Sequence, residues 1–306
     1  MNNLLPLMRR EWLQHRFAWA LLMLLPLALA VLPLAFGQIE FDSDSDMANR
    51  SGSELATLLG LISIVLSAAV IFMLVWVTSL FISTSLPRRD HADRSVEFWL
   101  SLPTGHAESF AAPLLVHLLL VPAAALLVGL LGGYAVSLLL VTRFVSLGEW
   151  LALPWGSLLA GTLSVAARVI AGLPLATLWL SPLILLAMLC TALFRRWGLP
   201  VLVVGVSLMS ALLRFVFGQP LMSETIGRLG RNAGLALAGA SGQGVLITDQ
   251  TEPLQALHDL PGWALQDLMA ALRDVASPLF VGAMVVSAAL FMLLVLWRQR
   301  GAGDAS

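Results

Sequence analysis

The chain has 306 residues, of which 59% are hydrophobic and only 11% are charged, with a mean hydropathy of +0.90 and a net charge of −1. Soluble domains are typically about 45–50% apolar and about 25% charged, so this composition excludes a water-soluble globular protein and indicates a polytopic membrane protein. All 17 basic residues are arginine, which excludes the chemistry of a nucleotide-loop or catalytic lysine, and the near-neutral balance argues against a nucleic-acid partner.

Six apolar runs are long enough to cross a bilayer, which requires about 20 residues of helix. None carries a charge in its central two turns. The sequence therefore predicts an all-α fold in which residues 1–306 form a single transmembrane domain of six helices. The predicted spans are about 17–37, 58–84, 113–138, 173–194, 199–217 and 278–297.

The arginines predict the orientation of these spans. If the N-terminus is cytoplasmic, the inner segments 1–16, 87–110, 195–198 and 298–306 contain ten of the 17 arginines, although the outer segments are about twice as long. Cytoplasmic loops carry the excess of basic residues in membrane proteins. We therefore expect both termini in the cytoplasm. The expected location is a bacterial inner membrane, with several passes through it.

The segment 151–171 is the uncertain part of this topology. It is apolar enough to count as a seventh span, which would reverse the orientation of everything after it. It also contains Pro154, Arg168 and several glycines and serines. We expect it to be an interfacial or re-entrant helix on the outer side.

Two cytoplasmic segments have the character of interaction surfaces. In the first, 1–16, the residues Leu5, Met8 and Trp12 recur at helical spacing among charged neighbours, which predicts an amphipathic interface helix. The second, 87–110, is far longer than a connection between two spans needs. It combines charges with apolar residues such as Trp99, which suggests that it docks on a protein partner.

The segment 218–277 is the largest region outside the spans. Within it, 262–275 places Leu265, Leu268, Met269, Leu272 and Val275 on one stripe, which predicts an amphipathic helix that lies on the outer leaflet or caps the bundle. The Gly/Ser-rich stretch 239–244 before this helix predicts a loop.

Signals for catalysis are weak. The GxSG string at 239–242 resembles that of intramembrane serine proteases, but it lies in a predicted polar loop. The five histidines show no i,i+3 or i,i+4 pairing and no HExxH motif, so we expect no metal site. The single cysteine, Cys190, has no mate for a disulfide.

With Arg10-Glu11 before the first span, six spans, and Asp93-Arg94, Glu97-Phe98-Trp99 and Leu102-Pro103 between spans two and three, the chain resembles the permease subunits of ABC-2-type exporters. The resemblance implies that 87–110 contains a coupling helix bound by an ATP-binding subunit. It implies two permease copies and two ATPase copies, with ATP and Mg²⁺ on the ATPase and no cofactor on this chain. The expected ATPase interface is Arg10, Glu11, Asp93, Arg94, Glu97, Phe98, Trp99, Leu102 and Pro103.

The expected function is therefore export of a molecule from the cytoplasm, driven by ATP that a separate subunit hydrolyses. Apolar spans without an acidic or amide cluster favour an amphiphilic or lipid-like cargo. Arg143, Arg168 and Arg214, near the outer ends of apolar runs, could contact an anionic headgroup, although anchoring at the interface explains each of them as well. The alternatives are an ion-coupled secondary transporter and a non-transporting membrane scaffold or sensor.

Overall fold

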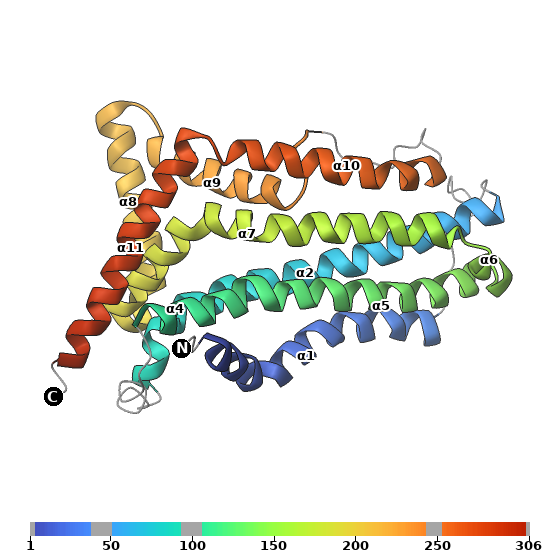
Figure 1. Cartoon of the computed structure of the whole chain (residues 1–306), viewed down its shortest axis with the longest axis horizontal. Helices are drawn as coiled ribbons and strands as arrows, with labels where there is room; N and C mark the ends of the chain where they lie inside the picture. The colour runs from blue at the N-terminus through green and yellow to red at the C-terminus, as the bar shows by residue number, and fades with distance from the viewer. Residues whose placement is uncertain (1–3, 38–50, 93–105, 243–252, 304–306) are drawn as a thin grey trace.

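The computed structural model describes residues 4–37, 51–92, 106–242 and 253–303, and every regular element in these ranges is a helix (Figure 1). Long helices are expected here because a chain without water around it must satisfy its backbone polar groups internally. The elements are α1 (Leu4–Phe36), α2 (Gly52–Ala92), α4 (His106–Leu115), a π-helical turn η1 (Val116–Leu120), α5 (Val121–Phe144), α6 (Leu147–Leu151), α7 (Trp155–Phe194), a 3₁₀ turn η2 (Arg195–Trp197), α8 (Gly198–Phe217), α9 (Leu221–Leu237), α10 (Pro253–Asp274) and α11 (Pro278–Gly303).

Among the described residues, five continuous helical stretches are long and apolar enough to cross a membrane: Leu5–Phe36, Gly52–Pro87, Ala107–Phe144, Trp155–Phe217 and Pro278–Gln299. The chain is therefore an all-helical protein with multi-pass membrane character. The fourth stretch contains two of the six predicted spans, 173–194 and 199–217, separated by η2. The count of six spans stays a prediction.

Helices α2 and α5 lie side by side along most of their length (Figure 1). Their backbones approach closely at Gly129 and Gly133 of α5. A Cβ at Gly129 would lie 2.7 Å from the Cα of Ala68, and one at Gly133 would lie 2.7 Å from the Cα of Ile64. This GxxxG spacing lets two membrane helices pack without side chains between them.

Helix α7 is the central element, because α2, α8, α9, α10 and α11 all pack against it. We expected an interfacial or re-entrant helix at 151–171 that is separate from the span at 173–194. Instead, residues 155–194 form one uninterrupted helix. Its first half runs along α2, and its second half turns toward α8 and α11 (Figure 1). Pro174 and Pro182 lie within this helix, and an internal proline removes a backbone hydrogen bond and bends the axis.

The segment 218–277 contains two helices, α9 and α10, which both pack on α7. The predicted amphipathic helix at 262–275 is the second half of α10, and the predicted loop is a turn at 238–242, with Gly239 and Gly242 at φ values of 96° and 70°. Helix α10 presents different residues outward and toward the bundle. Its predicted apolar stripe faces outward at Leu265, Met269 and Leu272, which are 62%, 54% and 48% exposed. The buried face is instead formed by Leu257, Leu260, Ala264, Asp267 and Ala271.

The ends of α2, α7 and α11 meet the start of α4 at one end of the molecule. Leu86, Phe110, Met188 and Leu294 are buried together there, one from each helix. The guanidinium of Arg298 also lies 5.1 Å from the centre of the Phe110 ring. The start of α1 joins the same end, as Figure 1 shows. The segments 1–16, 87–110, 195–198 and 298–306 therefore begin or end on one side of the bundle.

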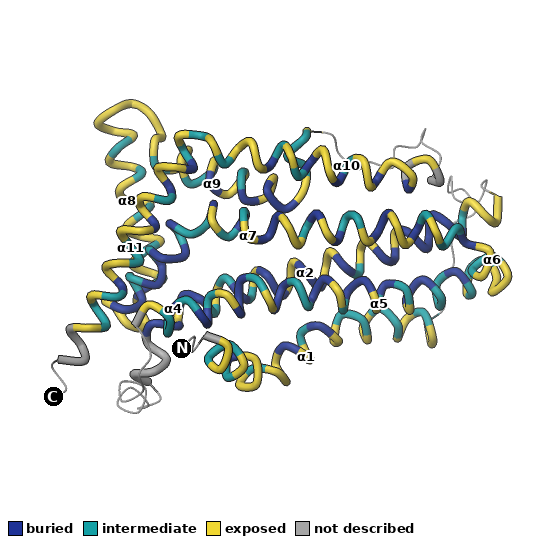
Figure 2. Tube along the Cα trace, in the orientation of Figure 1, coloured by how far each residue is buried: buried dark blue, intermediate teal, exposed yellow. Residues whose placement is uncertain are grey.

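Helix α8 is apolar yet stands away from the bundle (Figure 2). Gly198, in its first turn, is its only buried residue. A Cβ there would lie 2.4 Å from the Cα of Thr191, so the helix leaves α7 by a close backbone contact. Val203, Leu208, Leu212 and Phe215 are all more than half exposed. Such a surface is stable in lipid and would be a large exposed apolar patch in water.

Candidate functional site

A buried ion pair joins α7 to α10. The Arg168 Nη2 and Asp267 Oδ2 atoms are 2.8 Å apart, and the Arg168 Nε also donates to Oδ2 at 2.9 Å. Both side chains are 0% exposed. A charge withdrawn from water in this way is stable only with a partner and further hydrogen bonds.

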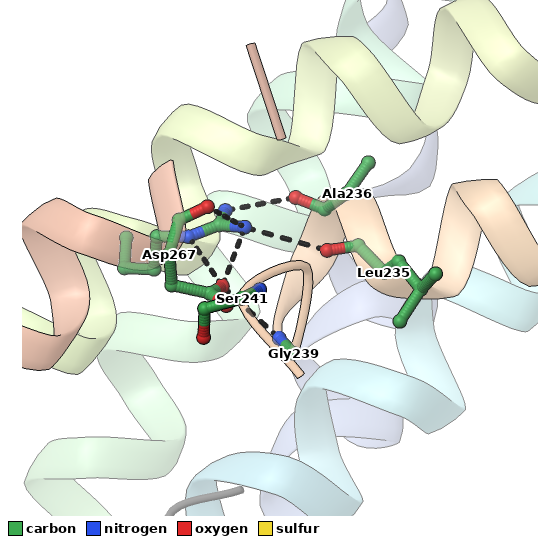
Figure 3. Close-up of polar contacts among 6 residues, drawn as sticks. Leu235, Ala236, Gly239, Ser241 and Asp267 are labelled. Carbon is green, nitrogen blue, oxygen red and sulfur yellow. Dashed lines mark hydrogen bonds and ion pairs between the residues drawn. The ribbon is translucent and has the colours of Figure 1, made fainter. Parts of the chain in front are cut away.

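The remaining bonds of this pair close the end of α9 (Figure 3). Arg168 donates from Nη1 to the carbonyl of Ala236 at 2.8 Å and from Nη2 to that of Leu235 at 3.4 Å. Asp267 accepts from the backbone amides of Gly239 at 3.0 Å and Ser241 at 2.7 Å. The last carbonyls of a helix have no partner within the helix, so Arg168 acts as its C-terminal cap.

The charge state of Asp267 follows from these contacts. Burial alone would raise the pKa of its carboxyl, but the hydrogen bonds from Ser241 and Gly239 and the charge of Arg168 together lower the pKa below its ordinary value. The carboxylate is therefore ionised at neutral pH. All three guanidinium nitrogens of Arg168 donate within the protein, so this site is a structural junction.

A second buried polar cluster lies where α1 meets η1. Glu11 and His117 are 2% and 0% exposed, and the Glu11 Oε2 and His117 Nε2 atoms are 3.5 Å apart. The half-buried His15 lies one turn after Glu11, and its ring centre is 5.6 Å from that of His117. The indole of Trp19 covers His117, with ring centres 5.8 Å apart.

The π-helical turn that carries His117 has a local cause in the sequence. Val121 donates to the carbonyl of Val116, five residues back, and Pro122 follows. Because proline has no amide hydrogen and its ring clashes with the carbonyl four residues back, it disfavours regular α-helix over this turn. Such π-bulges often occur at functional sites.

An apolar groove of about 450 Å³ lies between α4–η1, α7 and α11. Among the described residues, its polar lining side chains are three hydroxyls, those of Thr177, Ser181 and Ser287, and the Ser181 and Ser287 oxygens are hydrogen-bonded at 2.7 Å. The other lining residues are Ala111, Leu114, Leu115, Leu118, Leu119, Leu178, Ile184, Leu185, Met284, Ala288 and Phe291. A smaller apolar groove of about 360 Å³ lies between α1, α2 and α5. Surfaces of this kind suit acyl chains.

The three arginines proposed as headgroup contacts do not lie together. Arg168 is buried in the junction described above. Arg143 is exposed in the last turn of α5, where its Nη2 lies 3.4 Å from the carbonyl oxygen of Gly37. Arg214 is exposed in the last turn of α8. The ends of α5 and α8 are far apart in Figure 1, so these residues do not form one site.

The predicted ATPase interface is described only at its N-terminal residues. Arg10 is half-buried, and Glu11 is buried inside the protein beside His117, so Glu11 forms no part of an outer docking surface. The remaining seven residues, Asp93, Arg94, Glu97, Phe98, Trp99, Leu102 and Pro103, lie outside the described residues.

Comparison with known proteins supplies no family. No family model, no curated protein and no solved structure matches the chain. Its function must therefore be inferred from its own residues and geometry.

Sequence reasoning missed both buried clusters. For the Glu11–His117 cluster, the histidine spacings gave no signal, whereas the informative pair was Glu11 and His15, four residues apart and thus on one face of a helix. For the Arg168–Asp267 pair, the two residues are 99 positions apart, and no local pattern links them. The one available signal was an arginine within the apolar segment 151–171, because a charge in apolar surroundings requires a partner.

Proposed function

We propose that the chain is the membrane-spanning permease subunit of an ATP-driven exporter that moves an amphiphilic, lipid-like molecule, with ATP hydrolysed by a separate subunit. The observation that carries this proposal is the groove between α4–η1, α7 and α11. Its walls are apolar with three hydroxyls, and they end where the four segments predicted to be cytoplasmic come together. A force applied at that end would act directly on the groove walls.

The position of the segments predicted to be cytoplasmic supports ATP hydrolysis by a separate subunit as the energy source. The segment 87–110 links α2 and α4, and both helices pack in the cluster that contains Leu86, Phe110 and Leu294. Displacement of this segment by a partner would move α2 and α4 relative to α7 and α11. Rigid-body motion of packed helices is a common form of two-state switching. We therefore infer that two ATPase subunits act on two permease copies through this segment.

Co-purification tests this proposal. The chain is co-expressed with a candidate ATP-binding subunit, and complex formation and ATP hydrolysis are measured. We expect a stable complex whose hydrolysis is stimulated by the permease, and Trp99→Ala should weaken both. The matched control is Trp197→Ala in η2, an exposed indole outside the proposed interface. Equal assembly and turnover in the parent and Trp99→Ala would contradict docking through 87–110.

Ion-coupled secondary transport is a second candidate, because buried ionisable residues in membrane proteins often carry protons. The specific observation in its favour is the Glu11–His117 pair. In that case, transport would follow a proton gradient and proceed without ATP. Vesicle transport driven by a proton gradient alone would favour this candidate over the first.

A further inference from the structure

Glu11, His15 and His117 bring three potential metal ligands to one point. One ligand atom from each residue lies within 4.8 Å of the others. Glu11 and His15 occupy successive turns on the buried face of α1, and His117 comes from η1. The cluster thus joins two segments that are about 100 residues apart in the sequence.

His117 is the unusual member of the cluster. It is fully buried, and neither of its ring nitrogens has a hydrogen-bond partner in the part of the chain that the structure describes. Burial of a polar group without a partner is costly, so such a group requires an explanation. An ion bound to one ring nitrogen would supply that missing interaction.

The distance between Glu11 and His117 also fits a shared ion. Their Oε2 and Nε2 atoms are 3.5 Å apart but make no hydrogen bond. Two ligands about 2.1 Å from a tetrahedral zinc ion are separated by about 3.4 Å. The geometry at this pair is therefore already close to that of two ligands on one metal.

We propose that Glu11, His15 and His117 form a binding site for a divalent transition metal ion of the Zn²⁺ type. Two imidazoles and one carboxylate are a ligand set used for zinc, with the fourth position open, and imidazole nitrogens disfavour Mg²⁺ and Ca²⁺. The bound ion fixes the start of α1 to the π-helical turn, at the end of the molecule where the segment 87–110 begins and ends.

Metal titration of the purified, tag-free full chain in detergent tests this inference. After removal of metals with a chelator, Co²⁺ is added and its visible absorption is followed, with Zn²⁺ as a competitor. We expect one equivalent of Co²⁺ with the strong visible bands of tetrahedral coordination, displaced by Zn²⁺ and unaffected by Mg²⁺. His117→Asn, His15→Asn and Glu11→Gln should each weaken binding by at least about tenfold, because even loss of an outer-shell partner has an effect of that size.

The matched control is His258→Asn, since His258 is an exposed histidine on α10 that contacts Ser157. This variant should bind Co²⁺ as the parent does. The unmodified chain provides a test that does not depend on the folding of any variant: Zn²⁺ should raise its thermal unfolding temperature, and Mg²⁺ should not. Absence of stoichiometric binding and of the thermal shift in the parent would overturn the proposal, as would equal binding by His117→Asn and His258→Asn.

Discussion

Arg168 and Asp267 meet in a buried pair 2.8 Å apart, although 99 residues separate them in the chain. The pair joins α7 to α10 and closes the end of α9 through the carbonyls of Leu235 and Ala236. One arginine of α7 therefore makes polar contacts with both α9 and α10.

Removal of one member of this pair should destabilise the protein strongly. Arg168→Gln or Asp267→Asn is expected to cost about 3–5 kcal/mol, because each leaves a buried charge without its partner. The control is Glu224→Gln, which breaks the exposed Arg228–Glu224 pair of α9 and should cost about 0–1 kcal/mol. Thermal unfolding in detergent measures the difference. If the Arg168 and Asp267 variants unfolded at the same temperature as Glu224→Gln, the structural role of the pair would be contradicted.

The junction should also depend on pH. The pKa of Asp267 is lowered in the folded protein, so the folded state favours the ionised form. Its stabilising contribution is fully present above the unfolded pKa of about 3.9 and is lost as the pH falls through the lower folded value. When unfolding temperatures are measured from pH 7 to pH 3, we expect them to decrease once the pH is below about 4. Asp267→Asn should reduce this dependence, and an unchanged profile in that variant would assign the acid sensitivity to other groups.

Gly172 is required for the close approach of α7 and α9. A Cβ at this position would lie 2.0 Å from the carbonyl oxygen of Ala236 and 2.5 Å from the Nη1 of Arg168. Gly172→Ala should therefore destabilise by about 1–3 kcal/mol, as overpacking does. Gly230→Ala is the control, since a Cβ there meets nothing within 4 Å and alanine favours helix by up to about 1 kcal/mol. The unfolding temperature should decrease in Gly172→Ala and increase in Gly230→Ala. An unchanged unfolding temperature in Gly172→Ala would show that the two helices separate readily.

The membrane topology can be tested at two exposed positions. In a Cys190→Ala background, a cysteine at Gly148 in α6 should react with an impermeant thiol reagent added outside, whereas one at Arg196 in η2 should not. The long continuous helix α7 makes this test informative, because a full crossing by 155–172 in addition to 173–194 would place η2 outside. Labelling of Arg196→Cys from outside would therefore contradict the six-span prediction.

The sequence identified the long apolar helices because composition and run length depend only on local residues. It was less informative about which polar residues of these helices are buried. In α1, the expected apolar stripe is largely outward, with Leu5 76% and Trp12 40% exposed, while Glu11 lies inside. Helix α10 has a similar arrangement, with Leu265 outward and Asp267 buried. Hydrophobic patterns predict the buried face when water surrounds the protein, whereas a lipid-facing surface is as apolar as the core.

The remaining differences come from long-range contacts and proline geometry. Pro154, Arg168 and the glycines and serines of 151–171 suggested a separate segment, whereas α7 is continuous over Trp155–Phe194 and has neighbours packed along both of its halves. The π-helical turn before Pro122 places His117 against α1, and the side-chain period of a regular helix does not predict that position. The interface residues 93–103 lie outside the described residues, so their role stays a prediction.

The groove provides the most direct test of the proposed function. A lipid-like fluorescent substrate is followed in inside-out vesicles that contain the permease and its ATPase, with Ala288→Trp to fill the groove and Val285→Trp as a control. Ala288 lines the groove, whereas Val285 on the same helix is exposed and does not. We predict ATP-dependent movement into the vesicle that Ala288→Trp abolishes and Val285→Trp preserves. Transport that requires no ATP, or that continues equally in both variants, would contradict the account.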